Sequence, residues 1–105
     1  MDFVPDRGDI IWLTFNPQAG RRPAMVVSPA TYNSKTSLAL VCPITSQVKN
    51  YPFEVQIPKG IPIVGVILAD QVKSLDWKAR QGEKITSLPG DTVEEVIGKL
   101  ITLIE

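Results

Sequence analysis

The sequence contains no histidine and a single cysteine, and these two shortages narrow the chemistry available to the chain. Histidine is the commonest general base at neutral pH and a frequent metal ligand, and neither role can be filled by it here. Cys42 cannot form an internal disulfide, and it follows the apolar run 38–41. We therefore expect Cys42 to be a buried, unreactive thiol.

Net charge and long apolar runs are missing as well. Eleven basic and eleven acidic residues cancel, so no overall positive field attracts nucleic acid and any phosphate binding must be local. No segment approaches the ~18 consecutive apolar residues of a membrane-spanning helix. The first residues also lack the basic start and apolar run of a signal peptide. These absences predict a cytoplasmic protein without a membrane segment.

The length and apolar content of the chain fit one domain. The sequence has 105 residues, of which 44% are hydrophobic and 21% charged, so we expect a single globular domain over residues 1–105. A chain of this length buries only about two-thirds of its unfolded surface on folding. A partner subunit would add stability, which favours a dimer.

Strand-like runs fill most of the chain before residue 87. Residues 9–15 and 22–28 flank the turn residues 16–20 and predict a hairpin, and the continuous apolar run 37–44 predicts a central strand. Residues 29–36 between them read as a loop or a single helical turn. Further runs bring the expected sheet to about five to seven strands; they cover residues 51–57, 63–69, 71–75 and 83–86.

A helical pattern is clear only near the C-terminus. Apolar residues recur there at spacings of three and four and define one face; they are Val93, Val96, Ile97, Leu100, Ile101 and Ile104. Asp91 has the position of an N-cap, with Glu94 three residues on. Strands followed by one long helix favour an α+β fold: a small, strongly bent antiparallel sheet, SH3-like and barrel-like, with the helix lying across it.

Polar residues cluster where two of the predicted strands meet their loops. Arg22 lies at the start of the second strand, and Thr45, Ser46 and Gln47 follow the third. A guanidinium beside hydroxyl groups suggests a phosphate ligand. Taken alone, each residue also has an ordinary interpretation, because strand-end arginines are usually solvated and turn hydroxyls usually bond the local backbone.

Five segments, in order along the whole chain, resemble the MazF/PemK family of toxins. These segments are Gly8–Trp12, Arg22–Pro23, Pro43–Ser46, Tyr51–Val55 and Ala69–Ser74. The resemblance implies a CcdB/MazF-type fold and a homodimeric, sequence-specific endoribonuclease that needs neither metal nor other cofactor. It also implies a type II toxin that cuts single-stranded RNA, stops translation and is held inactive by a MazE-like antitoxin.

The resemblance also assigns roles to individual residues. The family's catalytic arginine and threonine fall on Arg22 and Thr45. Arg22 would neutralise the charge that grows on the phosphate when a 2′-hydroxyl attacks it, and Thr45 would donate a hydrogen bond or orient the attacking group. The expected products are a 2′,3′-cyclic phosphate and a 5′-hydroxyl, and the groups that move protons stay open.

RNA-binding positions follow from the same resemblance. Ser46 and Gln47 lie beside Thr45, Lys49 is placed to meet phosphates, and Asp70 and Gln71 align with residues that contact bases. Weaker candidates for RNA contact are Lys73, Lys78 and Trp77. Trp12 lies within an apolar strand, so we expect it in the core or at a dimer interface rather than stacked on a base.

The first hairpin loop departs from the family pattern. Related toxins carry a longer loop with a Ser-Glu-Gln or His-Glu-Gln segment, whereas this chain passes directly from Gln18-Ala19-Gly20 to Arg21-Arg22. The missing glutamate favours an alternative in which the same fold only binds RNA or a protein target such as gyrase. A third interpretation, a structural SH3-like interaction domain, leaves Arg22 and Thr45 unexplained.

Overall fold

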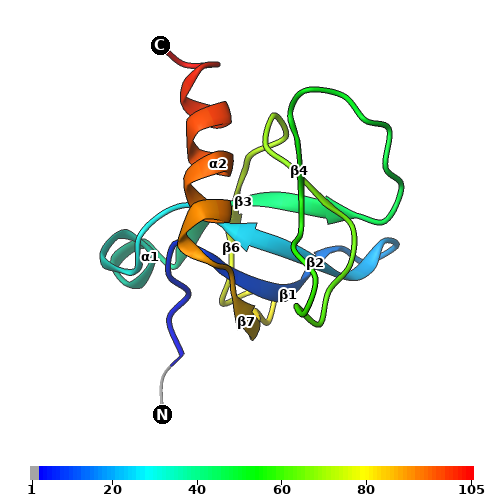
Figure 1. The fold of residues 1–105 in the computed structure, drawn as a ribbon. Coiled ribbons are helices and arrows are strands. Elements are labelled where there is room, and N and C mark those ends of the chain that lie inside the picture. Colours follow the sequence, from blue (N-terminus) through cyan, green and yellow to red (C-terminus); the bar gives the residue numbers. More distant parts are fainter. Residues whose placement is uncertain (1–2) are drawn as a thin grey trace.

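The computed structural model describes residues 3–105, and within them seven strands and two helices follow one another along the chain (Figure 1). Five of the strands precede residue 70 and the longer helix comes last, as expected for an α+β fold. The elements are β1 (Asp9–Asn16), β2 (Gly20–Val26), α1 (Ala30–Thr36), β3 (Leu38–Thr45), β4 (Glu54–Gln56), β5 (Val66–Leu68), β6 (Lys73–Asp76), β7 (Glu83–Ser87) and α2 (Gly90–Ile101).

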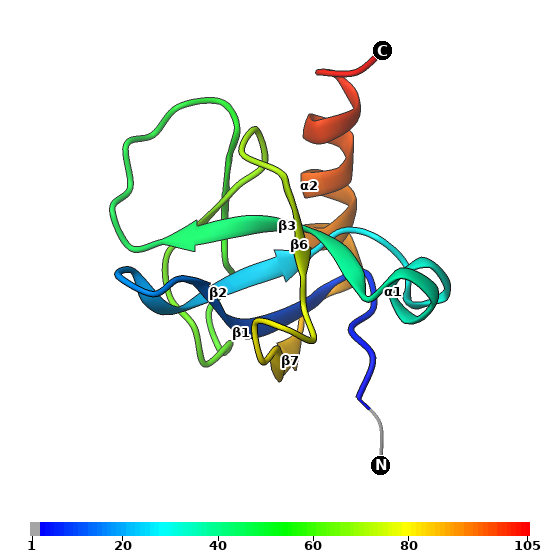
Figure 2. The same ribbon diagram turned by 180° about the vertical axis from the view of Figure 1, so that it is seen from behind.

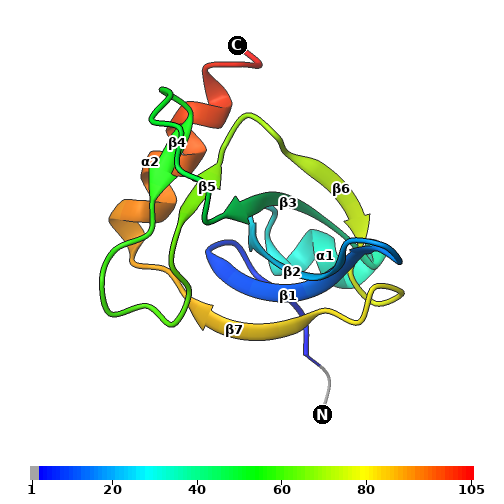
Figure 3. The same ribbon diagram turned by 90° about the vertical axis from the view of Figure 1, so that its right-hand side faces the viewer.

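All of the strand pairs are antiparallel, and β3 is central, as its continuous apolar run predicts. The strand order is β4-β5-β3-β2-β1-β7, and β6 also pairs with β3. The strands curl strongly, with β6 and β7 on either side of β1–β3 (Figure 3). The predicted β1–β2 hairpin and the bent antiparallel sheet are both confirmed.

The central strands are buried on both faces, which explains why their sequences are continuously apolar. Along β1, Ile10 belongs to one buried cluster and Ile11 and Leu13 to another, because successive side chains alternate across the sheet. The first cluster lies under α2 and includes Val96, while the second includes Trp77. Cys42 is fully buried in the first cluster, as expected.

Helix α2 lies across the sheet as predicted, but it begins and ends differently from the prediction. Its N-cap is Pro89, so the prediction that Asp91 caps the helix is wrong; Asp91 lies in the first turn and accepts a hydrogen bond from the Thr92 amide at 2.8 Å. The helix ends at Ile101, so Ile104 lies beyond it and is 77% exposed. No helix among residues 3–105 is long and apolar enough to cross a membrane.

Three further segments differ from their predictions, and one of them, the run 63–69, forms a strand only at Val66–Leu68. Residues 30–36 form the seven-residue helix α1 rather than a loop or single turn. The run 51–57 forms a strand only at Glu54–Gln56, opposite the three-residue β5, with one further backbone hydrogen bond on each side, at Phe53 and Ile57. Val55 and Ile57 are nevertheless buried, so the alternation in the sequence reports burial correctly but overestimates the length of the strand.

Candidate functional site

The register between β2 and β3 brings Arg22 and Thr45 to the same end of the sheet. Met25 pairs with Cys42 and Ala24 with Pro43, and Arg22 and Thr45 lie two residues beyond this pairing on β2 and β3. Figures 1 and 2 show that this end of β3 leads into the long loop before β4, away from α1. Two polar residues that lie far apart in the sequence are therefore at the same end of the sheet.

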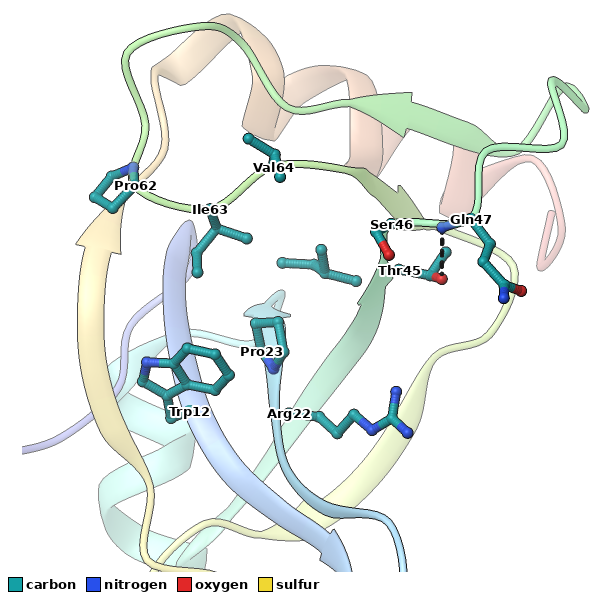
Figure 4. Close-up of a pocket in the computed structure, with 10 residues that line it drawn as sticks. Trp12, Arg22, Pro23, Thr45, Ser46, Gln47, Pro62, Ile63 and Val64 are labelled. Atoms are coloured by element: carbon teal, nitrogen blue, oxygen red, sulfur yellow. Dashed lines mark hydrogen bonds between the residues drawn. The ribbon is translucent and has the colours of Figure 1, made fainter.

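Three cavities adjoin Thr45. The Trp12 cavity, of about 590 Å³, is lined by Trp12, Arg22, Pro23, Ile44, Thr45, Ser46, Gln47, Pro62, Ile63 and Val64 (Figure 4). The Lys73 cavity, of about 260 Å³, is lined by Phe15, Asn16, Ala19, Arg22, Pro43, Ile44, Thr45, Gln71 and Lys73. The Tyr51 cavity, of about 200 Å³, is lined by Thr45, Gln47, Lys49, Tyr51, Glu54, Leu68 and Gln71.

The guanidinium of Arg22 is available for a ligand. Its Nε makes one long hydrogen bond, 3.4 Å, to the Ala19 carbonyl, and within residues 3–105 no carboxylate forms an ion pair with it. Arg21 is held instead by Glu83, at 2.6 Å, and by the Arg80 carbonyl, at 3.2 Å. Of these two adjacent arginines, only Arg22 lines the cavities.

Thr45 presents its hydroxyl as a hydrogen-bond donor. The Gln47 amide donates to Thr45 Oγ1 at 3.1 Å, which is the local backbone contact expected of a turn hydroxyl (Figure 4). A threonine hydroxyl has one proton and two lone pairs, so this contact uses a lone pair and leaves the proton free. The turn therefore orients Thr45 without consuming the hydrogen that a phosphate oxygen needs.

The loop that carries Ser46, Gln47 and Lys49 is held from two sides. The Glu54 carboxylate accepts hydrogen bonds from the Lys49 and Asn50 amides, both at 2.9 Å. On the other side Gly65, at φ +127°, lies so close to β3 that a Cβ atom would stand 2.2 Å from the Thr45 carbonyl oxygen. Only glycine fits this position.

Asp70 stands apart from the other candidates, because it lines none of the three cavities. Its carboxylate accepts a hydrogen bond from the Tyr51 hydroxyl at 2.8 Å. This bond raises the pKa of Tyr51 above its ordinary value, because it stabilises the protonated phenol. Tyr51 connects Asp70 to the cavity it lines beside Gln71 and Lys49.

Trp77 is not exposed as a stacking role requires and Trp12 is not in the core, while the alternative of a dimer interface for Trp12 stays a prediction. Trp77 is 4% exposed and donates to the Asn33 carbonyl, so it is not available for stacking on a base. Trp12 is 37% exposed and lines the largest of the three cavities, so it is not a core residue. Lys73 lines a cavity beside Arg22, whereas Lys78 lies over the Trp77 ring, 5.7 Å from its centroid.

The sequence reasoning missed Tyr51, and its expectation of a core position for Trp12 is wrong. Tyr51 appeared in the sequence analysis only as part of a family segment. No local sequence pattern predicts its hydrogen bond to Asp70, which is nineteen residues further along the chain. Trp12 alternates with the buried Ile11 and Leu13, a period-two signal that places it on the opposite face of β1. That signal identifies the face of β1 on which Trp12 lies. Whether other elements cover Trp12 on that face is decided by the tertiary structure.

The turn of the first hairpin leaves Arg22 uncovered. Three residues, Pro17 to Ala19, connect β1 to β2, and the Asn16 side chain accepts a hydrogen bond from the Ala19 amide at 2.6 Å. Arg22 is exposed beside this turn.

Residues 3–105 hold no group of three or more histidine, cysteine, aspartate or glutamate side chains that could bind a metal.

Comparisons with known proteins agree with this fold and cover nearly the whole chain. The family model described as "PemK-like, MazF-like toxin of type II toxin-antitoxin system" matches residues 6–104. The endoribonuclease toxin MazF of Escherichia coli K12 is 46% identical over 107 residues, which span 97% of this chain and 96% of the relative.

Solved structures show the same similarity in three dimensions. The crystal structure of MazF from Deinococcus radiodurans matches with a TM-score of 0.92 and 50% identity over 98% of both chains. A MazE-MazF structure from the same organism matches with a TM-score of 0.92 and 50% identity, over 98% of this chain and 97% of the other. The chain therefore belongs to the family of PemK-like and MazF-like toxins of type II toxin–antitoxin systems.

Proposed function

We propose that this protein is a sequence-specific endoribonuclease toxin that cleaves single-stranded RNA without a metal ion. The observation that carries the proposal is the convergence of Arg22 and Thr45 on the same two cavities. The names of the chain's relatives support the proposal, since the E. coli MazF and PemK proteins are called endoribonucleases. The RNA supplies its own nucleophile, so the enzyme needs to align groups and stabilise charge.

In the proposed reaction, the 2′-oxygen of a ribose attacks the adjacent phosphorus. The bond from phosphorus to the 5′-oxygen of the next nucleotide breaks, leaving a 2′,3′-cyclic phosphate and a 5′-hydroxyl. The 2′-hydroxyl loses a proton and the leaving 5′-oxygen gains one. The chain has no histidine to carry either proton, and an arginine keeps its own, so Arg22 acts through its charge and its hydrogen-bond donors.

The free donors of Arg22 and Thr45 suit a phosphate whose negative charge increases in the transition state. Arg22 offers a planar pair of N–H groups to two phosphate oxygens. Thr45 offers a single O–H to one oxygen, or to the attacking 2′-oxygen, with its position fixed by the Gln47 amide. Because both groups line the same two cavities before RNA binds, we expect little reorganisation during the reaction.

The neighbouring polar residues would hold the rest of the RNA. Ser46 and Gln47 line the Trp12 cavity, and Lys49 and Gln71 line the Tyr51 cavity. Asp70 accepts a hydrogen bond from Tyr51, which lines the second of these cavities. Amide and carboxylate groups can hydrogen-bond the exposed edges of unpaired bases. Lys49 can pair with a backbone phosphate. We assign these five residues to RNA binding.

The decisive experiment compares Arg22→Ala with Arg21→Ala on a long RNA in excess chelator. The wild-type protein and Arg21→Ala should cut at a short repeated sequence, whereas Arg22→Ala should lose cleavage by about 10²-fold or more. Arg21 is the matched control, because it has the same charge and adjacent position but is paired with Glu83. Intact RNA with the wild-type protein would overturn the proposal.

One observation favours a second function, a noncatalytic RNA-binding module. The three-residue turn before β2 provides no cover over Arg22. A protein of this kind would bind the RNA through Arg22 and leave it uncut with or without chelator. Measuring RNA binding together with RNA cleavage in the same experiment separates the two functions.

We also propose two protein partners: a MazE-like antitoxin and a second copy of this chain. An acidic antitoxin segment would complement Arg22, Lys49 and Lys73, which line the cavities. A second copy would cover the exposed apolar groove of about 410 Å³ between α1, β3 and α2, which includes Tyr32, Leu40 and Ile101. Two copies would bring two cleavage sites into one particle.

A further inference from the structure

One wall of the Trp12 cavity is apolar. Trp12 and Pro23 face each other across the β1–β2 pairing, and Ile63 and Val64 lie across the cavity from them (Figure 4). Trp12 is 37% exposed and Val64 is 79% exposed. Apolar groups left open to this degree inside a concavity indicate a place for an apolar or aromatic ligand group.

The rest of the same cavity is polar. Arg22, Thr45 and Ser46 line it on the side away from Trp12, and they include the groups proposed to bind the reacting phosphate. A ligand in this cavity must therefore carry a phosphate on one side and a flat, weakly polar group on the other. A single nucleotide of RNA has this division between its phosphate and its base.

We propose that Trp12 is a platform on which the base of a nucleotide next to the cleaved phosphate stacks. Pro23 lies beside the indole, and Ile63 and Val64 close the cavity over the base. This assignment rests on the proposed RNA-cleaving function and adds to it a subsite on the Trp12 side of the Arg22–Thr45 pair. Stacking tolerates any base, so the subsite contributes affinity and position rather than strict sequence choice.

The topology favours a base over a second protein chain at this place. Strand β1 is paired on both edges, with β2 and with β7, so the strand that carries Trp12 has no free edge to join another sheet. The exposed apolar residues proposed to contact a second copy line a different groove, on α1, β3 and α2. The polar wall beside Trp12 also fits a phosphodiester better than an apolar interface.

Tryptophan fluorescence provides a direct test, because the second tryptophan is buried. A single-stranded oligoribonucleotide pool, 2′-O-methylated so that it cannot be cut, is titrated into the wild-type protein and into Trp12→Phe. We expect quenching, and protection from acrylamide, in the wild type and neither in Trp12→Phe, since the remaining tryptophan, Trp77, is only 4% exposed. An oligonucleotide with the same phosphates but abasic sugars should bind more weakly and cause little quenching.

Affinity measurements with three variants separate stacking from general packing. Trp12→Ala should weaken binding of the 2′-O-methyl pool by about 5- to 150-fold, the range for loss of one base–aromatic stack. Trp12→Leu keeps an apolar side chain but no aromatic face and should be nearly as weak, while Trp12→Phe should recover much of the affinity. Leu103→Ala, an exposed apolar residue beyond α2, is the control and should bind normally.

Cleavage kinetics distinguish this inference from the proposed function. In Trp12→Ala, KM should rise with little change in kcat, because Arg22 and Thr45 remain. If the wild type cuts RNA and Trp12→Ala or Trp12→Leu matches its KM, the platform is wrong while the nuclease stands. The platform would also be wrong if the abasic oligonucleotide quenched Trp12 as strongly as the oligonucleotide pool with bases. It would be wrong as well if protection of Trp12 from acrylamide depended only on protein concentration, because a second protein chain would then cover the indole. If the wild type neither binds nor cuts RNA, both proposals are wrong.

Discussion

Arg21 and Arg22 are neighbours in the sequence, yet strand geometry gives them different environments. Successive side chains of β2 point to opposite faces, so Arg21 reaches Glu83 on β7 while Arg22 reaches the cavities beside Thr45. A surface ion pair such as that of Arg21 adds little stability, on the order of 0–1 kcal/mol. Arg22 has no such ion-pair partner within the described chain, so its guanidinium is available to bind a phosphate.

At the residue scale, we expect the Thr45 hydroxyl to be needed for turnover. Thr45→Val preserves the shape of the side chain but removes the donor, and it should lower kcat by about 10²- to 10³-fold. Thr45→Ser restores both the free proton and the contact with the Gln47 amide and should recover most of the rate. Single-turnover cleavage assays measure this, and equal rates for the valine and serine variants would exclude the proposed donor role.

Cys42 provides a second prediction at this scale. Burial, with a smaller effect from the charge of Asp70, raises the pKa of the Cys42 thiol from its ordinary 9.0 to about 12. A neutral, buried thiol should not react with a disulfide reagent at pH 8 until the protein is unfolded. Rapid reaction of the native protein would contradict this placement of Cys42.

The same pKa shift predicts how stability depends on alkaline pH. Below about pH 9 the thiol is protonated in both the folded and the unfolded chain. As the pH rises from 9 to 12 only the unfolded chain loses the proton, so the free energy of unfolding falls, by at most about 1.4 kcal/mol per pH unit. Urea titrations of the wild type and Cys42→Ala should show a shallower loss in the variant.

At the scale of elements, the contact between β3 and the start of β5 decides where Thr45 lies. A Cβ atom at Gly65 would overlap the Thr45 backbone carbonyl, and β5 pairs directly with β3 at Thr45 and Val66. The loop before β5 can therefore approach β3 closely only because residue 65 has no side chain. The geometry of the site depends on this packing as well as on the residues that line it.

Gly65→Ala should therefore damage both stability and cleavage. Its control is Gly60→Ala, because Gly60 also has a positive φ, +92°, but no atom lies within 4 Å of an added Cβ. Both variants should incur backbone strain, and Gly65→Ala should lose about 1–3 kcal/mol more from the overlap with β3. Denaturant unfolding and RNA cleavage measure the two effects, and equal losses in both variants would show that the close approach is unimportant.

At the scale of the whole molecule, the two sides of the fold have different surfaces. The rim near Thr45 is polar and hollowed by three cavities, whereas the groove between α1, β3 and α2 is apolar. Part of the apolar face of α2 packs on the core through Val96, and the part near its end, at Ile101, is 39% exposed. A small domain with such a groove gains stability by burying it against another chain.

We expect the wild-type protein to be a dimer and Ile101→Glu to be largely monomeric. A carboxylate in the groove would have to be desolvated, which opposes association, and the Nε of the nearby Arg7 already donates to the Val27 carbonyl. Ile104→Glu is the matched control, because Ile104 is 77% exposed and does not line the groove. Sedimentation velocity over a range of concentrations reports the mass, and a monomeric wild type, or equal behaviour of the two variants, would contradict the proposed interface.

The sequence by itself determined the elements of the core. Continuous apolar runs identified the central strands, turn residues identified the first hairpin, and the spacing of Val93, Val96 and Leu100 identified α2. These signals are local, because alternation and helical periodicity follow from backbone geometry. The family segments added Arg22 and Thr45 as the candidate catalytic pair, and in the structure both line the same two cavities.

Only the tertiary structure decided how far each pattern extends and which exposed group matters. Asp91 resembles an N-cap, but the chain enters α2 through Pro89, and residues 51–57 form a strand only opposite the short β5. Trp12 and Trp77 both accompany apolar residues, yet Trp77 is enclosed with Phe3 whereas α2 covers Ile10 and leaves Trp12 open. Burial depends on neighbours distant in the sequence, and no local pattern encodes them.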